Sequence, residues 1–451
     1  MSTLPGKVYD EIVSLANKSA ISLVRFIFCD TSSIIRGKST KVERLRDRLE
    51  SGIGLVKGTM AMNMLDQGQF DTGLGATGEV RLVPDPDTWT VLPYCDRSAA
   101  MICDLIELDH KPWAMCPRTL LKKQIAVAKE MGFSMQVAFE PEFMLGNWDN
   151  DRFVFVDNSL CFSTDGMNRA SKFINRFVDC LERQSIEVEQ YYPELGPGQH
   201  ELSIRQAEAM RACDRHIFYR ETLRGVAMEQ GVEAYLAPKP FENQPGNGCH
   251  LHLSVWDIYG ERNLFWSDSG LSDFGRFFVA GVLAHLKGLV ALTCASVNSY
   301  RRLKPKAWSS AYTCWGFENR EAAVRIPSVY WGQELATTNI ELKCVDSSSN
   351  PYVALAAVIA AGLDGVRRQL QLPPEVTTDP STLSPEEMER CSIERLPSSL
   401  HEALIELEQD ELLMNMLGEF GPVYVAVKTS ECGAFAGANV DFELSHHRSI
   451  F

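Results

Sequence analysis

Runs of alternating and helix-spaced apolar residues divide the first quarter of the chain into short elements. An N-terminal helix is followed by strand character over residues 21–30, a turn-like stretch over 31–38 and helix spacing over 42–49. The stretch over residues 67–88 is dense in Gly, Asp and Pro, and residues 67–78 within it predict a long loop, of a length that is often functional. Strand character returns over residues 88–94 and 99–107.

The remainder alternates strand-like and helical segments without an internal repeat. A new helix is predicted to start near Pro117, so we place a boundary between Asp109 and Pro117 and divide the chain into residues 1–110 and 111–451. Residues 372–390 form a polar connection, and helices are predicted over 399–408 and 411–417. The pattern predicts an α+β chain with a small N-terminal domain and a large catalytic one.

The stretch "VAFEPEFML" (residues 137–145) has strand character and carries two acids two positions apart. In a strand, Glu140 and Glu142 point to the same face. On an open surface, water would solvate both carboxylates. In an apolar setting, buried like charges are costly unless a cation neutralises them.

Three further stretches supply possible partners. Glu194 and Glu201 flank a Gly-Pro-Gly turn, His250 and His252 share one face of a predicted strand, and Glu341 lies in another strand-like run. Each acid alone is explained by a loop or surface position, and an H-x-H pair is often a surface pair. Together, oxygen-rich ligands with one nitrogen favour Mg²⁺ or Mn²⁺ over zinc.

Two arginine-bearing stretches lie near these acids in the sequence. "NSYRRLKP" contains Arg301 and Arg302, and "NREAAVRIP" contains Arg320 and Arg325. A spacing of five places Arg320 and Arg325 on opposite faces of a regular strand, or one of them in the preceding loop. One interpretation is that these arginines are surface charges or form structural ion pairs. The other is that they bind a phosphate or carboxylate beside the acids through paired hydrogen bonds.

Composition narrows the classes of function. The net charge of −15 disfavours binding to a nucleic-acid backbone. The 13 cysteines include no C-x-x-C pair, which favours reduced thiols in a cytoplasmic protein. No secretion signal is evident, and the apolar stretches 277–297 and 350–366 are interpreted as core helices, not membrane spans.

Several motifs occur in the order found in one known family. They are "EPEF", "ELGPGQHE", "PKPF", "GNGCHLHLSVWD", "NSYRRL", "NREAAVRIP" and "IELK", followed by "NPYVALAAVIAAGLDGV". The chain resembles the glutamine synthetase superfamily, in particular its type I branch and the γ-glutamyl-amine ligases, most strongly from Pro117 to Arg367. The resemblance implies a small β-grasp-like N-terminal domain, a large domain with a curved antiparallel sheet flanked by helices, and homo-oligomers in double-ring dodecamers.

The resemblance also implies site roles, with ATP as co-substrate and two divalent ions, Mg²⁺ or Mn²⁺. One ion would be held by Glu142, Glu194 and Glu201 and the other by Glu140, His250 and Glu341. Arg320 and Arg325 would steady the transferred phosphoryl group, Arg325 also touching the nucleotide. His252 and Ser254 would contact the nucleotide, and the amino-acid pocket would include Arg302, Gly246, Lys343 and Trp308.

The departures from the family pattern concern the amine end. No D-G-S-S-like segment precedes "LVPDPDT", and Trp308 stands where a glutamate usually closes the site. Without these two acids, the site lacks the negative charge that would bind ammonium. An indole can instead pack on an organic amine or form a cation–π contact with it. The alternative is that Trp308 only packs against its neighbours and contacts no substrate. In the amino-acid pocket, Lys343 replaces an arginine and Pro245 an asparagine.

The chain is therefore predicted to be an ATP-dependent ligase that joins glutamate to an organic amine through a γ-glutamyl phosphate. The alternatives are glutamine synthetase using ammonia and a non-catalytic relative, which the six retained ligands disfavour. Asp66, Asp71 and Glu321 are candidates for the general base. Glu394, at the place of a modified tyrosine in some bacterial enzymes, argues against adenylylation.

Overall fold

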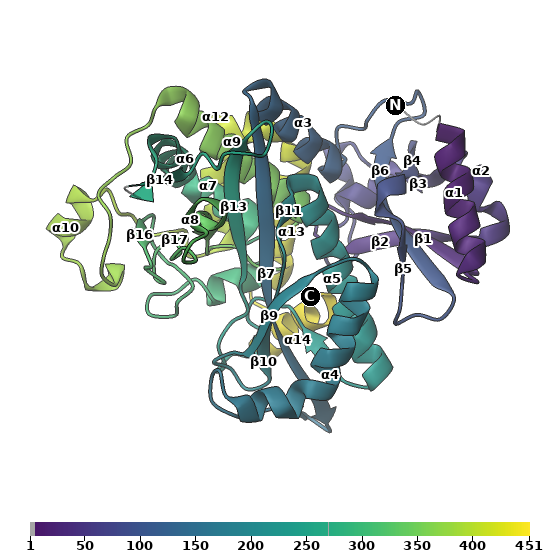
Figure 1. Cartoon of the computed structure of the whole chain (residues 1–451), viewed down its shortest axis with the longest axis horizontal. Coiled ribbons are helices and arrows are strands. Elements are labelled where there is room, and N and C mark those ends of the chain that lie inside the picture. Colours follow the sequence, from purple (N-terminus) through teal and green to yellow (C-terminus); the bar gives the residue numbers. More distant parts are fainter. Residues whose placement is uncertain (1–4, 269) are drawn as a thin grey trace.

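The N-terminal domain is built on a six-stranded sheet with the order β2-β1-β6-β4-β3 and with β5 added on β6. The structure is a computed structural model that describes residues 5–268 and 270–451 (Figure 1). Strands β1 and β6 run parallel, and the other pairs are antiparallel. The elements are α1 (Pro5–Lys18), β1 (Leu23–Cys29), β2 (Ile35–Lys41), η1 (Val42–Arg44), α2 (Leu45–Ser51), β3 (Ile53–Val56), η2 (Lys57–Ala61), η3 (Phe70–Thr72), β4 (Glu79–Pro84), η4 (Pro86–Thr88), β5 (Thr90–Val91) and β6 (Ser98–Ile106).

The sequence prediction for this domain is confirmed in part. Of the strand predicted over 88–94 only Thr90–Val91 (β5) forms, and β3 and β4 were not predicted. The strand predicted over 21–30 is β1, and the loop predicted over 67–78 contains only the short turn η3. The predicted turn over 31–38 is wrong in its second half, because β2 begins at Ile35. Strand β2 is a largely exposed edge strand, so backbone pairing with β1 forms it without an apolar alternation that the sequence would reveal.

The larger C-terminal domain is organised by a ten-stranded sheet with β7 at its centre. The main path is β16-β17-β18-β13-β7-β10-β9, and β8, β11 and β12 also pair with β7; all pairs are antiparallel except β16 with β17. Its elements up to β15 are α3 (Pro117–Glu130), β7 (Phe133–Asp149), β8 (Arg152–Phe155), α4 (Thr164–Arg183), β9 (Val188–Pro193), β10 (Gln199–Ile204), β11 (Ala207–Glu208), α5 (Ala209–Gln230), β12 (Glu233–Tyr235), β13 (Cys249–Asp257), β14 (Trp266–Ser267) and β15 (Gly270–Leu271).

The second half of this domain is mostly helical. Its elements are α6 (Asp273–Ala284), α7 (Leu286–Thr293), η5 (Val297–Arg301), β16 (Trp315–Phe317), β17 (Val324–Ile326), α8 (Glu334–Thr337), β18 (Ile340–Leu342), α9 (Pro351–Arg368), η6 (Pro380–Thr382), α10 (Pro385–Arg390), α11 (Leu400–Gln409), α12 (Glu411–Leu417), α13 (Phe420–Phe435) and α14 (Val440–Ile450). The connection predicted over 372–390 contains α10, which a Ser384–Glu387 capping box starts. The predicted helices over 399–408 and 411–417 correspond to α11 and α12.

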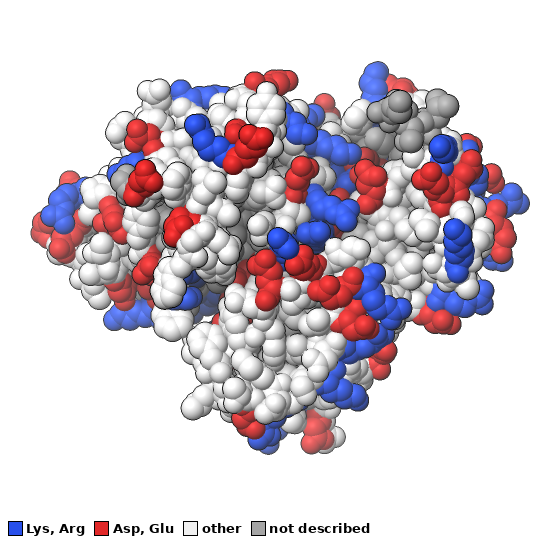
Figure 2. Space-filling model, viewed as in Figure 1, with Lys and Arg blue, Asp and Glu red and all other residues white. Residues whose placement is uncertain are grey.

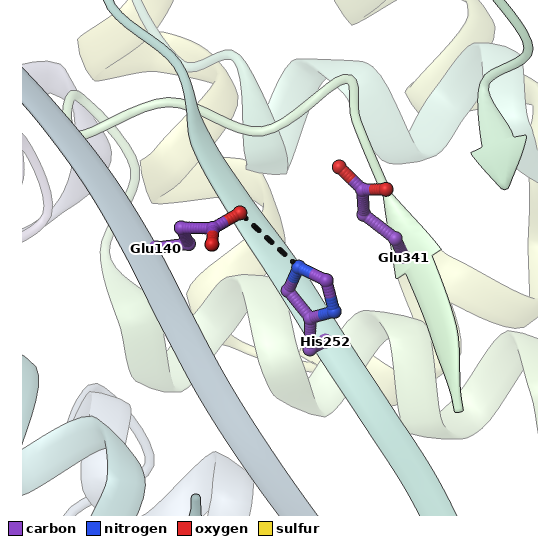
Figure 3. Close-up of side chains that lie close together, drawn as sticks. All are labelled: Glu140, His252 and Glu341. Carbon is purple, nitrogen blue, oxygen red and sulfur yellow. Dashed lines mark hydrogen bonds and ion pairs between the residues drawn. The ribbon is translucent and has the colours of Figure 1, made fainter. Parts of the chain in front are cut away.

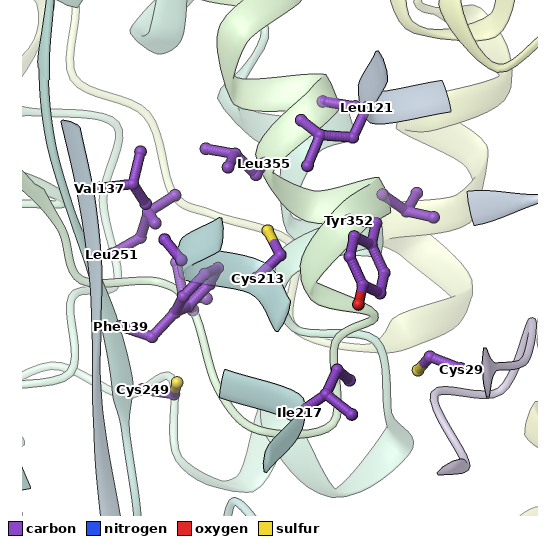
Figure 4. Packing of buried hydrophobic residues seen from close by; sticks show 14 of the residues in the cluster. Cys29, Leu121, Val137, Phe139, Cys213, Ile217, Cys249, Leu251, Tyr352 and Leu355 are labelled. Carbon is purple, nitrogen blue, oxygen red and sulfur yellow. The ribbon is translucent and has the colours of Figure 1, made fainter. Parts of the chain in front are cut away.

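The two faces of the central sheet have different environments. Val137, Phe139 and Phe143 of β7 are buried in the core, where Figure 4 shows Val137, Phe139 and Leu251 of β13 beside Leu355 of α9. Because side chains alternate along a strand, Glu140 and Glu142 point to the opposite face. Helix α9 is buried along almost its whole length, between this sheet and α6. The apolar face therefore gives the acids of the other face a rigid backing.

Buried charges join the two domains. The Arg118 guanidinium pairs with Asp85 and Asp104 and, on α5, with Asp214. On α13, Lys428 and Glu431 form a buried ion pair at 2.9 Å. Glu431 also accepts hydrogen bonds from the Ser32 hydroxyl and the Met64 amide.

Neither a patch of one charge on the face in view nor a long apolar helix stands out in the described part of the chain. On the face in Figure 2, basic and acidic side chains are interspersed. Among the described residues, no single helix is long and apolar enough to cross a membrane; only the pair α6 and α7, bent by 76°, reaches that length and composition together. The thirteen cysteines are free.

The buried pair on α13 gives a first prediction. Glu431→Ala leaves the Lys428 ammonium buried without a partner, so the free energy of unfolding should fall by about 3–5 kcal/mol in denaturant titrations. Glu419→Ala, an exposed acid next to the same helix, is the control and should change little. A loss as small as that of the control would show that the pair does not hold the domains together.

His285 gives a prediction about pH. Its Nδ1 lies 2.7 Å from Asp410 Oδ2 and its Nε2 lies 3.2 Å from Asp364 Oδ2, an acid that Arg368 also contacts. Burial alone would lower the pKa of His285, but the hydrogen bonds and charges of Asp410 and Asp364 outweigh burial and raise that pKa. A raised pKa contributes stability that is complete below the unfolded-state value of about 6.5 and is lost as the pH rises through the folded-state value.

The stability lost in His285→Gln should therefore be larger near pH 6 than at pH values above the folded-state pKa of His285. Denaturant unfolding over this pH range measures it, with the exposed His401→Gln as control. A difference between wild type and His285→Gln that does not change with pH would contradict the assignment.

Candidate active site

Strand register brings the predicted acids and histidines into one row across the sheet. His250 of β13 lies opposite Glu140 of β7, and Glu142 lies opposite Glu201 of β10. On the other side of β13, His252 lies opposite Glu341 of β18. Residues as far apart in the sequence as Glu140 and Glu341 thus share one face of four adjacent strands.

Two groups of side chains have possible ligand atoms within 4.8 Å of one another: Glu140, His252 and Glu341, and Glu140, Glu201 and His250. Figure 3 shows the first group: Glu140 points toward His252, to which a dashed line joins it, and Glu341 lies on the strand on the other side of His252. His252 Nε2 lies 3.3 Å from Glu140 Oε2, and His250 Nδ1 lies 3.3 Å from Glu341 Oε1. The geometry therefore places His252 among the possible ligands, in addition to His250.

Glu142 and Glu201 are held by neighbours from other strands. Glu142 Oε2 accepts a hydrogen bond of 2.9 Å from the Gln199 amide and one of 3.1 Å from the Gly248 amide. Glu201 accepts a hydrogen bond from the Tyr192 hydroxyl of β9. Glu194 follows β9 directly, at the turn that leads into β10.

The three acids that lack a basic partner are pushed toward protonation. Burial, followed by the charge of Glu142, raises the pKa of Glu194 to about 7. Burial and then the charges of Glu140 and Glu142 raise the pKa of Glu201 well above its usual range, and burial also raises that of Glu142. These carboxylates carry more negative charge than the surrounding side chains neutralise.

The two acids next to basic groups behave in the opposite way. Burial would raise the pKa of Glu341, but the charges of Lys343, His250, His252 and Arg325 outweigh burial and lower the pKa to about 2. Bonds from His250 and His252 likewise outweigh burial at Glu140 and hold its pKa well below the usual range. Burial lowers the pKa of His250 to about 4, and a neutral imidazole is the form that binds a metal ion.

The donor set fits a hard divalent cation. Five carboxylates and one or two imidazoles converge, and oxygen-rich sets of this kind suit Mg²⁺ and Mn²⁺. The same convergence without a cation would leave Glu142, Glu194 and Glu201 in mutual repulsion.

The predicted arginines and Lys343 surround this row. Arg325 lies on β17, and its Nη1 is 2.7 Å from Glu341 Oε2; Arg320 lies in the turn before β17, as one of the two alternatives predicted. The Lys343 ammonium is buried 3.4 Å from Glu341 Oε1. The Nε atoms of Arg302 and Arg325 are buried without a hydrogen-bond partner among the described residues, which leaves donors for an anionic ligand.

Gly246 lies against Arg302 in the predicted amino-acid pocket. A Cβ at Gly246 would come within 2.7 Å of Arg302 Cγ and 2.6 Å of the Pro238 carbonyl oxygen, so only glycine allows this approach. The Gly246 carbonyl accepts a hydrogen bond from the same Gln199 amide that holds Glu142. Arg302 in turn donates to the Val345 carbonyl oxygen at 2.9 Å.

Trp308 lies in the segment between Arg302 and β16, which we call the flap (residues 303–314). Its side chain is 53% exposed, and its backbone has a positive φ of 51°. The Trp308 amide donates to Glu321 Oε1 at 2.9 Å, so the indole rather than a carboxylate projects from this point. The predicted nucleotide contact Ser254 is buried, and its hydroxyl accepts a hydrogen bond from Trp256.

Three residues that hold the site were not predicted to do so, although Gln199 lies within the motif "ELGPGQHE". Tyr192 and Gln199 contact the acids directly, and Asn339 Oδ1 lies 2.9 Å from His252 Nδ1, which fixes the ring orientation. Their roles depend on pairing between distant strands, which a single sequence does not specify. Among the general-base candidates, Asp66 pairs with Arg36, Asp71 lies in η3, and only Glu321 contacts the flap.

The fold and the site together describe a row of acids suited to a divalent cation, flanked by buried arginine and lysine side chains. Family models for the glutamine synthetase N-terminal domain and the glutamine synthetase catalytic domain match residues 9–113 and 114–447. The chain therefore belongs to the glutamine synthetase family, whose members use ATP and divalent Mg²⁺ or Mn²⁺.

The similarity to known proteins extends over nearly the whole chain. The glutamine synthetase of Pyrococcus abyssi is 32% identical over 93% of this chain and 92% of its own length, and that of Mycobacterium bovis is 34% identical over 88% and 89%. Among solved structures, a novel glutamine synthase homologue is 33% identical with a TM-score of 0.85 over 96% of this chain and 99% of its own. A GmaS/ADP complex is 29% identical with a TM-score of 0.84 over 96% and 98%.

Gln199 gives a prediction for the site. Gln199→Leu removes one of two hydrogen bonds to Glu142 and should weaken Mn²⁺ binding, measured by calorimetry, about 10–100-fold. Gln190→Leu, an exposed glutamine on the neighbouring β9, is the matched control and should bind Mn²⁺ normally. Unchanged Mn²⁺ affinity in folded Gln199→Leu would remove Glu142 from the metal site.

Proposed function

We propose that the chain is an ATP-dependent ligase that joins the side-chain carboxylate of glutamate to an organic amine. The observation that carries the proposal is the exposed indole of Trp308 at the flap, where family members that use ammonia place a glutamate. Similarity to GmaS, a γ-glutamylmethylamide synthetase, supports the same reading. Membership of the family supports the ATP-dependent ligase chemistry itself.

The proposed reaction has two steps. A side-chain carboxylate oxygen of glutamate attacks the γ-phosphorus of ATP and displaces ADP, which gives γ-glutamyl phosphate. The amine nitrogen then attacks the acyl carbon, phosphate leaves, and the nitrogen loses a proton. Divalent ions held by Glu140, Glu142, Glu194, Glu201, His250 and Glu341, with His252 close by, would offset the charge on the phosphates.

The basic residues of the chain would serve both steps. Arg302, buried with a free Nε, would hold the α-carboxylate of glutamate beside Gly246. Arg320 and Arg325 would steady the transferred phosphoryl group, and Arg325 and Ser254 would contact the nucleotide. Lys343 neutralises Glu341 in the structure, which keeps the acidic row from repelling the substrate carboxylates.

The part of the site where the amine would enter combines the apolar surface of Trp308 with the carboxylate of Glu321. Trp308 would pack on the alkyl part of an amine or contact its cation, worth about 0.5–2 kcal/mol. Glu321, whose pKa is raised by burial, lies beside it and is our candidate for accepting the proton of the attacking amine. The same carboxylate is the observation that favours the second candidate, glutamine synthetase, because it could bind ammonium.

The assembly and the division of the chain belong to the proposal. We take residues 1–110 and 111–451 as the two domains, and a cytoplasmic double-ring dodecamer as the working form. Light scattering coupled to size-exclusion chromatography tests the assembly.

An amine panel tests the choice of substrate. With ATP, Mg²⁺ and glutamate, phosphate release should be faster with methylamine, ethylamine or diamines than with ammonia, and Trp308→Glu should shift the ratio of kcat/KM toward ammonia by about tenfold or more. Trp331→Glu, a change of the same kind at a fully exposed tryptophan, is the control. Efficient turnover with low ammonia alone would establish the second candidate.

A further inference from the structure

A cavity of about 580 Å³ opens on the catalytic domain between α6, α7 and α11. Its apolar wall is formed by Leu283, Ala284 and Pro373, and its polar wall carries Lys287, Glu406 and Asp410. The volume lies in the range of small-molecule sites, which combine an apolar surface with a few charged groups.

The cavity is separate from the acidic row. The acids of β7 face away from α9, and α9 lies between the central sheet and α6. The cavity is lined by α6 and α7, which belong to the helical side of the domain. None of the predicted metal, nucleotide or amino-acid ligands lines it, although Thr313 of the flap does.

The charges in the cavity favour a cation. Three carboxylates line it, those of Glu394, Glu406 and Asp410, against the basic groups of Lys287 and His285. Lys287 contacts Glu394 closely and Glu406 only at 3.9 Å, while Asp410 is occupied by His285. Glu406 therefore has capacity for a further cationic partner.

The spacing of these acids favours an organic cation over a metal ion. Among the described residues, the groups with ligand atoms close enough for one ion are those of the active site, not those of the cavity. An aliphatic ammonium ion would place its alkyl part on Leu283, Ala284 and Pro373 and its charge beside Glu406.

The cavity is connected to the flap through Glu394. The Glu394 amide donates to the Thr313 hydroxyl at 2.8 Å, and the Thr313 amide donates to the Glu394 carbonyl oxygen at 2.9 Å. The Leu396 amide also donates to the Ala311 carbonyl oxygen at 3.0 Å. The side chain of the same Glu394 pairs with Lys287 in the cavity, so one residue touches both places.

We propose that this cavity is a regulatory site for a small aliphatic amine, whose ammonium group competes with Lys287 for Glu406 and Glu394. When Glu394 no longer pairs with Lys287, segment 391–396 changes its hydrogen bonding to residues 311–313. The conformation of the flap, which contains residues 311–313, changes as a result. The inference goes beyond the proposed function and does not depend on which amine, or ammonia, is the substrate.

The test is calorimetry, which measures binding of 1,4-diaminobutane to the full chain. Nucleotide and glutamate are left out of the titration. Glu406→Gln should weaken binding of this probe about tenfold, and Ala284→Phe, a change at an exposed lining position, should abolish binding in the cavity. Glu408→Gln, the same change on an exposed residue of α11, should bind as wild type does. The neutral 1,4-butanediol should not bind.

Amide hydrogen exchange tests the connection. Binding should change the exchange of residues 311–313 and 391–396 at least threefold in wild type and not in Ala284→Phe. Absence of binding, or binding that both Glu406→Gln and Ala284→Phe leave intact, would overturn the site. Binding without any change in exchange would overturn the link to the flap.

Discussion

Mutual repulsion between carboxylates is the constraint on which the rest of the structure depends. Five acids are brought together from β7, the β9–β10 turn, β10 and β18, and burial makes their repulsion costly. Only a stiff sheet with fixed register can hold them in place. The helices α4, α5 and α9, packed on the other face through Phe139 and Phe143, provide that stiffness and most of the domain's core.

The acidic row is also tied to the proposed amino-acid pocket through shared partners. One amide, that of Gln199, donates to Glu142 and to the carbonyl oxygen of Gly246. On the other side, Arg325 and Lys343 both contact Glu341. Binding of cations and binding of anionic substrates thus act on the same side chains, so each should favour the other.

Features that depend on short stretches of sequence could be predicted from the sequence alone. The alternation in residues 137–145 predicted that Glu140 and Glu142 share a face, and family motifs predicted the fold. Strand β2 was missed because an exposed edge strand has no apolar alternation, and α13 and α14 were not predicted as separate helices. Tyr192, Gln199 and Asn339 were missed because their partners lie on other strands, and the place of His252 beside Glu341 likewise depends on strand register.

On the proposed function, the contacts to the attacking nitrogen and the phosphoryl chemistry lie on different parts of the fold. The metal row lies on regular strands whose register leaves little freedom. The flap has no strand or helix of its own, carries positive φ at Lys306, Trp308 and Ser310, and is held by Glu321 and by its pairing with residues 391–396. On the proposed function, a change from ammonia to an organic amine would involve new side chains in the flap and in the N-terminal segment before "LVPDPDT", while the acids of the row stay as they are. This separation explains how one fold can retain every predicted ligand and still differ at Trp308.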